Sequence, residues 1–161
     1  MALRMILKDS DPVLFKKCRH VTKFNERLAE LLDDMKETLQ EANGVGLAAP
    51  QVGVLRRAAV VLDTSDPENI KHVEFVNPTI IEAEGEQYGP EGCLSVPGEY
   101  GMVRRPNKVL VQAQDRNGNE FIFEAEGLNA RICCHELDHL DGILFTELAD
   151  EFLVDEIEDE E

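Results

Sequence analysis

The hydrophobic and polar positions of the chain recur with two periods, one typical of helices and one typical of strands. From Phe24 to Ala42 the apolar residues recur at steps of three and four, while charged residues fill the positions between them. This pattern gathers the apolar side chains on one face and predicts an amphipathic helix. Asn43 and Gly44 follow, and both tolerate the left-handed conformation that ends helices.

Shorter apolar runs in the middle of the chain predict strands. Ala58–Leu62 and Val73–Ile81 contain β-branched residues, and the segments 109–113 and 121–123 alternate apolar with polar positions. An Asn-Gly pair at positions 117 and 118 separates the last two segments. Because Asn-Gly favours the tight turns of hairpins, these segments are expected to pair as antiparallel strands.

The last long periodic segment, from Leu128 to about Leu140, predicts a second helix. One stripe carries Cys133, Leu137 and Leu140 and suits core packing, whereas another carries two histidines and a glutamate. The order helix, strands, helix favours an α+β fold. With no repeat and no Ser- or Pro-rich linker, residues 1–150 are expected to form one domain, followed by an acidic tail over 151–161.

Composition and charge narrow the classes of function. No stretch approaches the ~20 apolar residues that a membrane helix needs, and the N-terminal apolar run is too short for a secretory signal. We therefore expect a cytoplasmic protein without a membrane partner. The formal net charge of -17 disfavours direct binding of nucleic acid. Four cysteines, two of them adjacent, do not resemble a disulfide framework, so each is expected to be free, a metal ligand or a nucleophile.

The segment His135-Glu136-Leu137-Asp138-His139 is the strongest chemical signal. Residues four apart lie on the same face of a helix, so both imidazoles can reach one metal ion. Such an ion brings the pKa of a bound water towards neutrality, and the carboxylate of Glu136 can take the proton. The segment therefore predicts a hydrolytic metal centre that needs one more protein ligand.

Three positions compete for the role of third ligand. A metzincin-type protease would carry a third histidine downstream, but Phe145 occupies that position. Glu147 and Glu151 would suit a zincin-like peptidase, although carboxylates are common in that acidic stretch. Cys93, in a short glycine-containing turn, is the better candidate because a thiolate binds divalent transition metals well.

A third segment, Gly44-Val45-Gly46-Leu47-Ala48-Ala49-Pro50-Gln51, follows the first predicted helix. Its small residues leave room for another backbone to approach closely, and the amide of Gln51 can donate a hydrogen bond. It does not match a phosphate loop, because no Lys-Ser/Thr pair follows.

Taken in order, this segment, Glu91-Gly92-Cys93-Leu94-Ser95 and the histidine segment resemble the three signature motifs of the peptide deformylase family. The resemblance implies an enzyme that removes the N-formyl group from formylmethionyl nascent chains and releases formate. It implies antiparallel strands packed around a central metal-binding helix, with an amphipathic helix near the N-terminus. Family members use Fe²⁺, and Ni²⁺, Co²⁺ or Zn²⁺ can occupy the same site.

The resemblance also assigns roles to individual residues. The metal ligands would be Cys93, His135 and His139, with Glu136 as general base and acid. The amide of Gln51 and the backbone N–H of Leu94 would stabilise the developing oxyanion. The peptide would lie extended beside the backbone of Val45, Gly46 and Gly92, and its methionine side chain would enter a pocket walled by Val45, Leu128, Ile132 and His135.

Outside the catalytic set, the resemblance suggests that Glu91 pairs with Arg105 and steadies the Cys93 turn. Cys134 replaces a glutamine that is usual in the family, and we expect it to be buried and turned away from the ligand face. Arg131 stands where bacterial relatives often have an aliphatic residue; we expect it in solvent, or else at the pocket rim. The acidic end of the chain is a poor docking element for ribosomal RNA.

Overall fold

The computed structural model describes residues 2–153. Eight strands form two antiparallel sheets, and two α-helices and three short 3-10 helices complete the fold. The larger sheet has the strand order β1-β2-β3-β6-β7, and the smaller has the order β4-β5-β8. The strands of the larger sheet are β1 (Gly46–Ala48), β2 (Ala58–Asp63), β3 (Lys71–Glu84), β6 (Lys108–Gln114) and β7 (Glu120–Glu126). Those of the smaller sheet are β4 (Gln87–Cys93), β5 (Val96–Arg105) and β8 (Glu151–Leu153).

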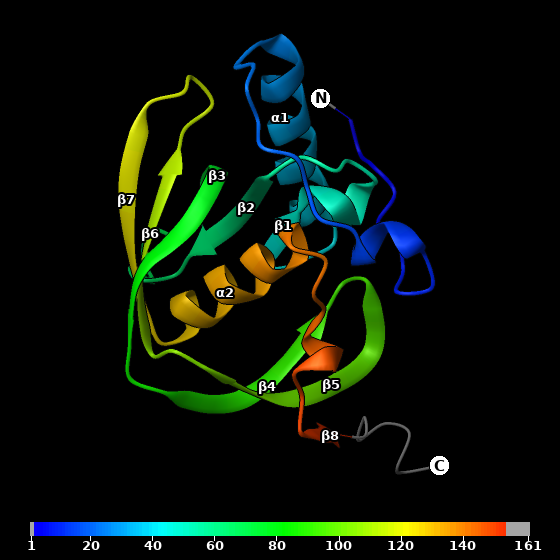
Figure 1. Cartoon of the computed structure of the whole chain (residues 1–161), viewed down its shortest axis with the longest axis vertical. Helices are drawn as coiled ribbons and strands as arrows, with labels where there is room; N and C mark the ends of the chain where they lie inside the picture. Colours follow the sequence, from blue (N-terminus) through cyan, green and yellow to red (C-terminus); the bar gives the residue numbers. More distant parts are fainter. Residues whose placement is uncertain (1, 154–161) are drawn as a thin grey trace.

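Helix α2 (Leu128–Leu140) lies between the two sheets and packs against strands of both (Figure 1). Most of its side chains are buried, including the polar ones on the face that carries the histidines. The sequence pattern predicts one apolar stripe for core packing and a second stripe that carries the two histidines and Glu136. Because a sheet covers each side of the helix, both stripes are removed from solvent.

Helix α1 (Glu26–Glu41) packs its apolar face against β1 and β2. The side chain of Asn25 accepts a hydrogen bond from the backbone N–H of Leu28 and so satisfies one free donor at the helix start. Past the last turn, Asn43 adopts the positive φ of 56° that the sequence anticipates at this boundary. The helix end leads directly into β1, which places the glycine-rich segment beside α2.

The predicted hairpin is confirmed by β6 and β7, which pair along their whole length across the turn at residues 115–119. Gly118 has a φ of 88°, a conformation that favours glycine. In the same turn, Arg116 donates to Glu74 on β3 and to Asp33 on α1, and Lys36 also pairs with Glu74. This network ties the hairpin turn to the first helix.

The C-terminal end of the described chain differs from the sequence-based expectation. An acidic tail is predicted from residue 151 onwards, but Glu151–Leu153 forms β8 and pairs with Tyr100–Met102 of β5. The acidic run at 155–161 lies outside the described residues. Across residues 2–153, neither α-helix combines the length and the apolar character that crossing a membrane requires.

Candidate metal centre

Cys93, His135 and His139 come together where β4 ends beside α2. One potential ligand atom from each of these residues lies within 4.8 Å of the other two. The Sγ of Cys93 is 3.4 Å from the Nε2 of His139, and the two imidazole centroids are 4.9 Å apart. A thiolate and two imidazoles at such separations can hold one divalent transition metal ion.

The two histidines are buried, and a contact with Glu91 orients His135. Nδ1 of His135 lies 2.9 Å from Oε1 of Glu91, which leaves its Nε2 free for an ion. Burial lowers the pKa of His139 well below its ordinary value, so this imidazole is neutral, as a metal ligand must be. Burial also opposes charge on His135, but contacts with Cys93, Glu136 and Glu91 outweigh it and raise its pKa to about 10. The same contacts that favour a proton on His135 would favour a metal ion in place of that proton.

Glu136 is the fourth functional side chain of the centre, beside the three potential ligands. Its side chain is 3% exposed, and burial raises its pKa to about 7. Among residues 2–153, no hydrogen-bond partner reaches its Oε1. Buried carboxylate oxygens are normally paired, so this free acceptor beside the three ligand atoms fits a site that receives water. The donor set and this acceptor therefore both suit a hydrolytic metal ion.

The competing third ligands lie elsewhere. Glu147, in the 3-10 helix Phe145–Glu147, accepts a hydrogen bond from the backbone N–H of Leu144, and Glu151 lies on the exposed strand β8. Phe145 stacks against the ring of His135. Within the described part of the chain, the one cluster of three or more ligating side chains is that of Cys93 with the two histidines. The geometry thus favours the cysteine over either glutamate.

Gln51, in the 3-10 helix Ala49–Val52, presents its amide to the same centre. Oε1 accepts from the backbone N–H of Ala48 at 2.9 Å, and Nε2 donates to Oγ of Ser95 at 3.1 Å. Nε2 also lies 3.6 Å from Sγ of Cys93. The bond to Ala48 fixes the orientation of the amide, so its N–H groups face the cysteine turn that contains Leu94.

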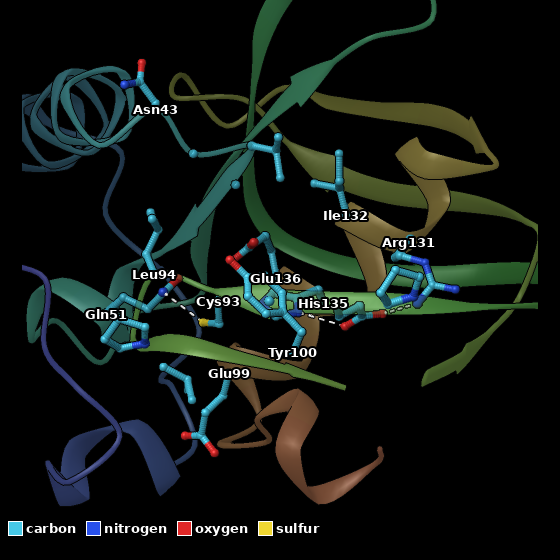
Figure 2. A pocket seen from close by; sticks show the side chains of 18 of the residues that line it. Asn43, Gln51, Cys93, Leu94, Glu99, Tyr100, Arg131, Ile132, His135 and Glu136 are labelled. Atoms are coloured by element: carbon cyan, nitrogen blue, oxygen red, sulfur yellow. Dashed lines mark hydrogen bonds and ion pairs between the residues drawn. The ribbon is translucent and has the colours of Figure 1, made fainter. Parts of the chain in front are cut away.

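A pocket opens from this centre to solvent (Figure 2). Val45 and Leu128 lie at its mouth and are 47% and 56% exposed, whereas Ile132 is buried in its wall. Its lining includes all six residues that the resemblance associates with the substrate, namely Val45, Gly46, Gly92, Leu128, Ile132 and His135. An apolar cleft with a few polar groups at one end is typical of a small-ligand site.

Glu91 is buried at this end of the pocket rather than on the surface. Its carboxylate accepts two hydrogen bonds from Arg105, at 2.8 and 2.9 Å, so the pairing expected from the resemblance is present. Burial raises the pKa of a carboxyl group, but the contacts with Arg105 and His135 outweigh burial and lower the pKa of Glu91 to about 2. Arg105 also donates to Asp138 of α2, a contact that the sequence does not reveal.

The expectation that Arg131 extends into solvent is wrong. Its side chain is 8% exposed and donates to Glu91 at 2.7 Å. Arg131 precedes His135 by four residues and therefore lies on the same helical face; that spacing is the signal that sequence reasoning missed. The expected burial of Cys134 is confirmed, and burial raises the pKa of its thiol to about 11.

Comparisons with known proteins all match one family. Residues 3–153 match the family model for polypeptide deformylase. The peptide deformylase of Caldicellulosiruptor bescii is 57% identical over 156 residues, which cover 97% of this chain and 91% of the relative. That of Agathobacter rectalis is 54% identical, covering 91% and 90% of the two chains. The crystal structure of a peptide deformylase from Legionella pneumophila superposes with a TM-score of 0.86 at 43% identity, covering 92% of this chain and 86% of the other. That from Thermotoga maritima also gives 0.86, at 37% identity, with 92% and 98% covered.

Proposed function

The chain belongs to the polypeptide deformylase family, and we propose that Cys93, His135 and His139 hold the metal ion on which its activity depends. It is a hydrolase that removes the N-formyl group from newly made polypeptides. The observation that carries the ligand assignment is the convergence of one sulfur and two imidazoles within 4.8 Å. We propose Fe²⁺ as the resident ion, with Ni²⁺, Co²⁺ or Zn²⁺ able to substitute, because mixed thiolate and imidazole sites accept all of these ions. When bound, the ion supplies a Lewis acid that acidifies water and polarises the formyl carbonyl group.

Glu136 is proposed to move the proton. The free, buried Oε1 can accept a proton from water as the new C–O bond forms, and can then deliver it to the amine as the C–N bond breaks. The products are formate and a free N-terminus, with no change in oxidation state. Burial supports this role because the carboxylate is a stronger base there than in water, as its raised pKa indicates.

Gln51 and the backbone N–H of Leu94 are proposed to offset negative charge on the formyl oxygen. The side-chain amide of Gln51 is already held by Ala48 and directed towards the cysteine turn. Donors fixed in advance stabilise a transition state without further reorganisation, and losing one of them typically costs about 10²–10³ in rate.

The formylmethionyl peptide is proposed to bind as an added strand. β1 is an edge strand of the larger sheet, and the pocket is lined by its first residue, Gly46, and by Val45 just before it. A peptide laid between this edge and the Gly92 segment can bond through its backbone, with its first side chain directed towards Leu128 and Ile132. Backbone pairing is independent of sequence, which suits an enzyme that acts on many different nascent chains.

We propose that residues 1–150, together with strand β8, act as one catalytic domain and that the protein works in the cytoplasm. Any transient contact with the ribosome would involve a surface other than the acidic residues 155–161, because the negative charges of this segment and of ribosomal RNA repel each other. No direct role in binding nucleic acid is proposed, in keeping with the net charge of -17.

Release of formate from formyl-Met-Ala-Ser tests the proposal. Protein purified without oxygen and loaded with Fe²⁺ should hydrolyse this peptide, a chelator should abolish turnover, and added metal should restore it. Air should inactivate the enzyme and reductant should protect it, since a thiolate and Fe²⁺ both oxidise. Formate no higher than in a protein-free control, despite a full complement of metal, would contradict the proposal.

A further inference from the structure

Arg131 connects the helix that carries the two histidines to the strand that ends at Cys93. Its Nη1 donates to Oε2 of Glu91 at 2.7 Å and to the backbone carbonyl oxygen of Gly89 at 3.3 Å. Both acceptors belong to β4, whereas Arg131 belongs to α2. Figure 2 shows the guanidinium at the end of the pocket beside His135.

Glu91 links Arg131 to His135, which is a proposed metal ligand. Its Oε2 accepts from Arg131, and its Oε1 meets Nδ1 of His135 at 2.9 Å. Because Arg131 and His135 are one helical turn apart, the same carboxylate holds both side chains. Arg131 therefore bonds to no proposed ligand atom directly. It is linked to His135 through one buried group, the carboxylate of Glu91.

Arg105 does not duplicate this connection. It lies on β5, the hairpin neighbour of β4, so its two bonds to Glu91 remain within the smaller sheet. Among the residues that the structure describes, its direct bond to α2 is the one with Asp138, whose side chain is 27% exposed. Arg131 bonds β4 directly from α2, inside the protein and beside the centre.

The backbone of β4 is shaped to receive the guanidinium. Position 89 is a glycine, and a Cβ added there would lie 3.2 Å from Nη2 of Arg131 and 3.6 Å from Cζ. A Cβ at this position would therefore sit closer to the guanidinium than an ordinary contact and would shift it by a few tenths of an ångström. The absence of a side chain at Gly89 lets Arg131 approach β4 closely and donate to both a carbonyl oxygen and a carboxylate.

We infer that Arg131 is a positioning residue that sets the separation between Cys93 and the two histidines by fastening β4 to α2. The inference rests on the proposed metal site and adds a residue that is not one of its ligands. Partners that orient metal ligands typically change metal affinity or activity about 10- to 100-fold when they are removed. Loss of Arg131 should loosen the ligand set while leaving all three ligands in the chain.

The test measures how fast Co²⁺ leaves the protein. Four variants are compared with the parent: Arg131→Met, which keeps the length of the side chain; Arg131→Lys; Gly89→Ala; and the control Arg104→Met. Arg104 is a neighbouring arginine on β5 that is 58% exposed and pairs with surface carboxylates. Release into excess chelator is followed through the thiolate–cobalt absorption band, and kcat and KM are measured with formyl-Met-Ala-Ser.

We expect Arg131→Met to release Co²⁺ about tenfold faster, to shift the cobalt bands, and to lower kcat more than it raises KM. Arg131→Lys should recover part of the loss, because it restores a cation and a donor. Gly89→Ala should act in the same direction, since it displaces the guanidinium without changing the charge. Arg104→Met should stay within twofold of the parent.

The outcomes separate this inference from the proposed function. A parent protein that binds no Co²⁺ through Cys93 would overturn the ligand assignment itself. A parent that binds Co²⁺ while Arg131→Met releases it at the parental rate, or more slowly, would overturn the positioning role; slower release would mean that the arginine acts only by repelling the ion. Circular dichroism and thermal unfolding check that each variant folds, and Gly89→Ala carries the test should Arg131→Met unfold.

Discussion

The α-carbon of Gly46 lies against the side chain of Glu136, so closely that a Cβ built on the glycine would collide with the carboxylate. Gly46 opens β1, and Glu136 projects from α2 towards it. The glycine-rich segment thus has a role at the metal centre that could not be predicted from its sequence. It provides the space in which the buried carboxylate stands.

Gly46→Ala should therefore inactivate the enzyme by displacing Glu136. We expect a fall in kcat/KM of about 10² or more, the usual range for losing a general base, while the metal content stays at one ion per chain. Formate release and elemental analysis on the same sample provide the measurement. In a Glu136→Gln background, Gly46→Ala should lower kcat/KM little further, because both substitutions remove the same function, proton transfer by Glu136. A double variant whose loss equals the sum of the two single losses in free energy would count against this explanation.

Glu136→Gln should keep the metal and lose turnover. The amide is nearly isosteric with the carboxylate but cannot accept the proton, so we expect kcat to fall by about 10²–10⁴. Elemental analysis should show an unchanged metal content. A variant as fast as the parent would refute the assignment of the proton carrier.

Cys93→Ala should lose the metal, whereas Glu147→Gln should keep it. The first change removes one of three ligand atoms, and the second leaves an amide oxygen able to accept from the backbone N–H of Leu144. Equilibrium dialysis against Co²⁺ distinguishes the two variants. Retention by Cys93→Ala together with loss by Glu147→Gln would support the zincin-like alternative instead.

Glu74→Gln should reveal a pH-dependent contribution to stability far from the metal. Burial opposes the charge on Glu74, but its bonds to Arg116 and Lys36 outweigh burial and lower its pKa. A lowered pKa in the folded state stabilises the protein above the pKa of the unfolded chain, and this contribution disappears as the pH falls through the folded value. We expect the variant to be less stable by about 1 kcal/mol at pH 7.

The difference between parent and Glu74→Gln should shrink as the pH is lowered below about 4, where the carboxyl of the parent becomes protonated. Urea unfolding of both proteins at each pH gives the two free energies of unfolding. Loss of metal at low pH affects both proteins alike, because Glu74 pairs with groups on α1 and the β6–β7 hairpin turn rather than with the centre. A difference that stays constant over this range would contradict the assigned ion pairs.

Local patterns were sufficient for several parts of the fold. The periodic segment before Asn43 lies in α1, and the Asn-Gly turn joins β6 to β7 as predicted. Both features depend on residues close together in the chain, through side-chain periodicity and backbone preference. The third ligand could not be decided in that way. The sequence favours Cys93 over Glu147 and Glu151, but only the fold brings one of them to the histidines.

Local sequence patterns also could not predict which charged groups are buried. Arg131 resembles an exposed helix residue because its partners, Glu91 and the backbone at Gly89, lie about 40 positions away. Likewise, β8 reads as part of an acidic tail because the pairing that makes it a strand is with β5, about 50 positions earlier.

The sequence by itself determined the chemistry that is available: two imidazoles one helical turn apart, a carboxylate beside them, a thiol in a glycine-containing turn, and a glycine-rich segment with an amide at its end. The tertiary structure decided which of these groups meet, how their pKa values shift, and which arginines become buried among them. The reason is physical. Helical phase and turn preference are set by neighbours in the chain, whereas burial and ion pairing depend on the surfaces that fold together.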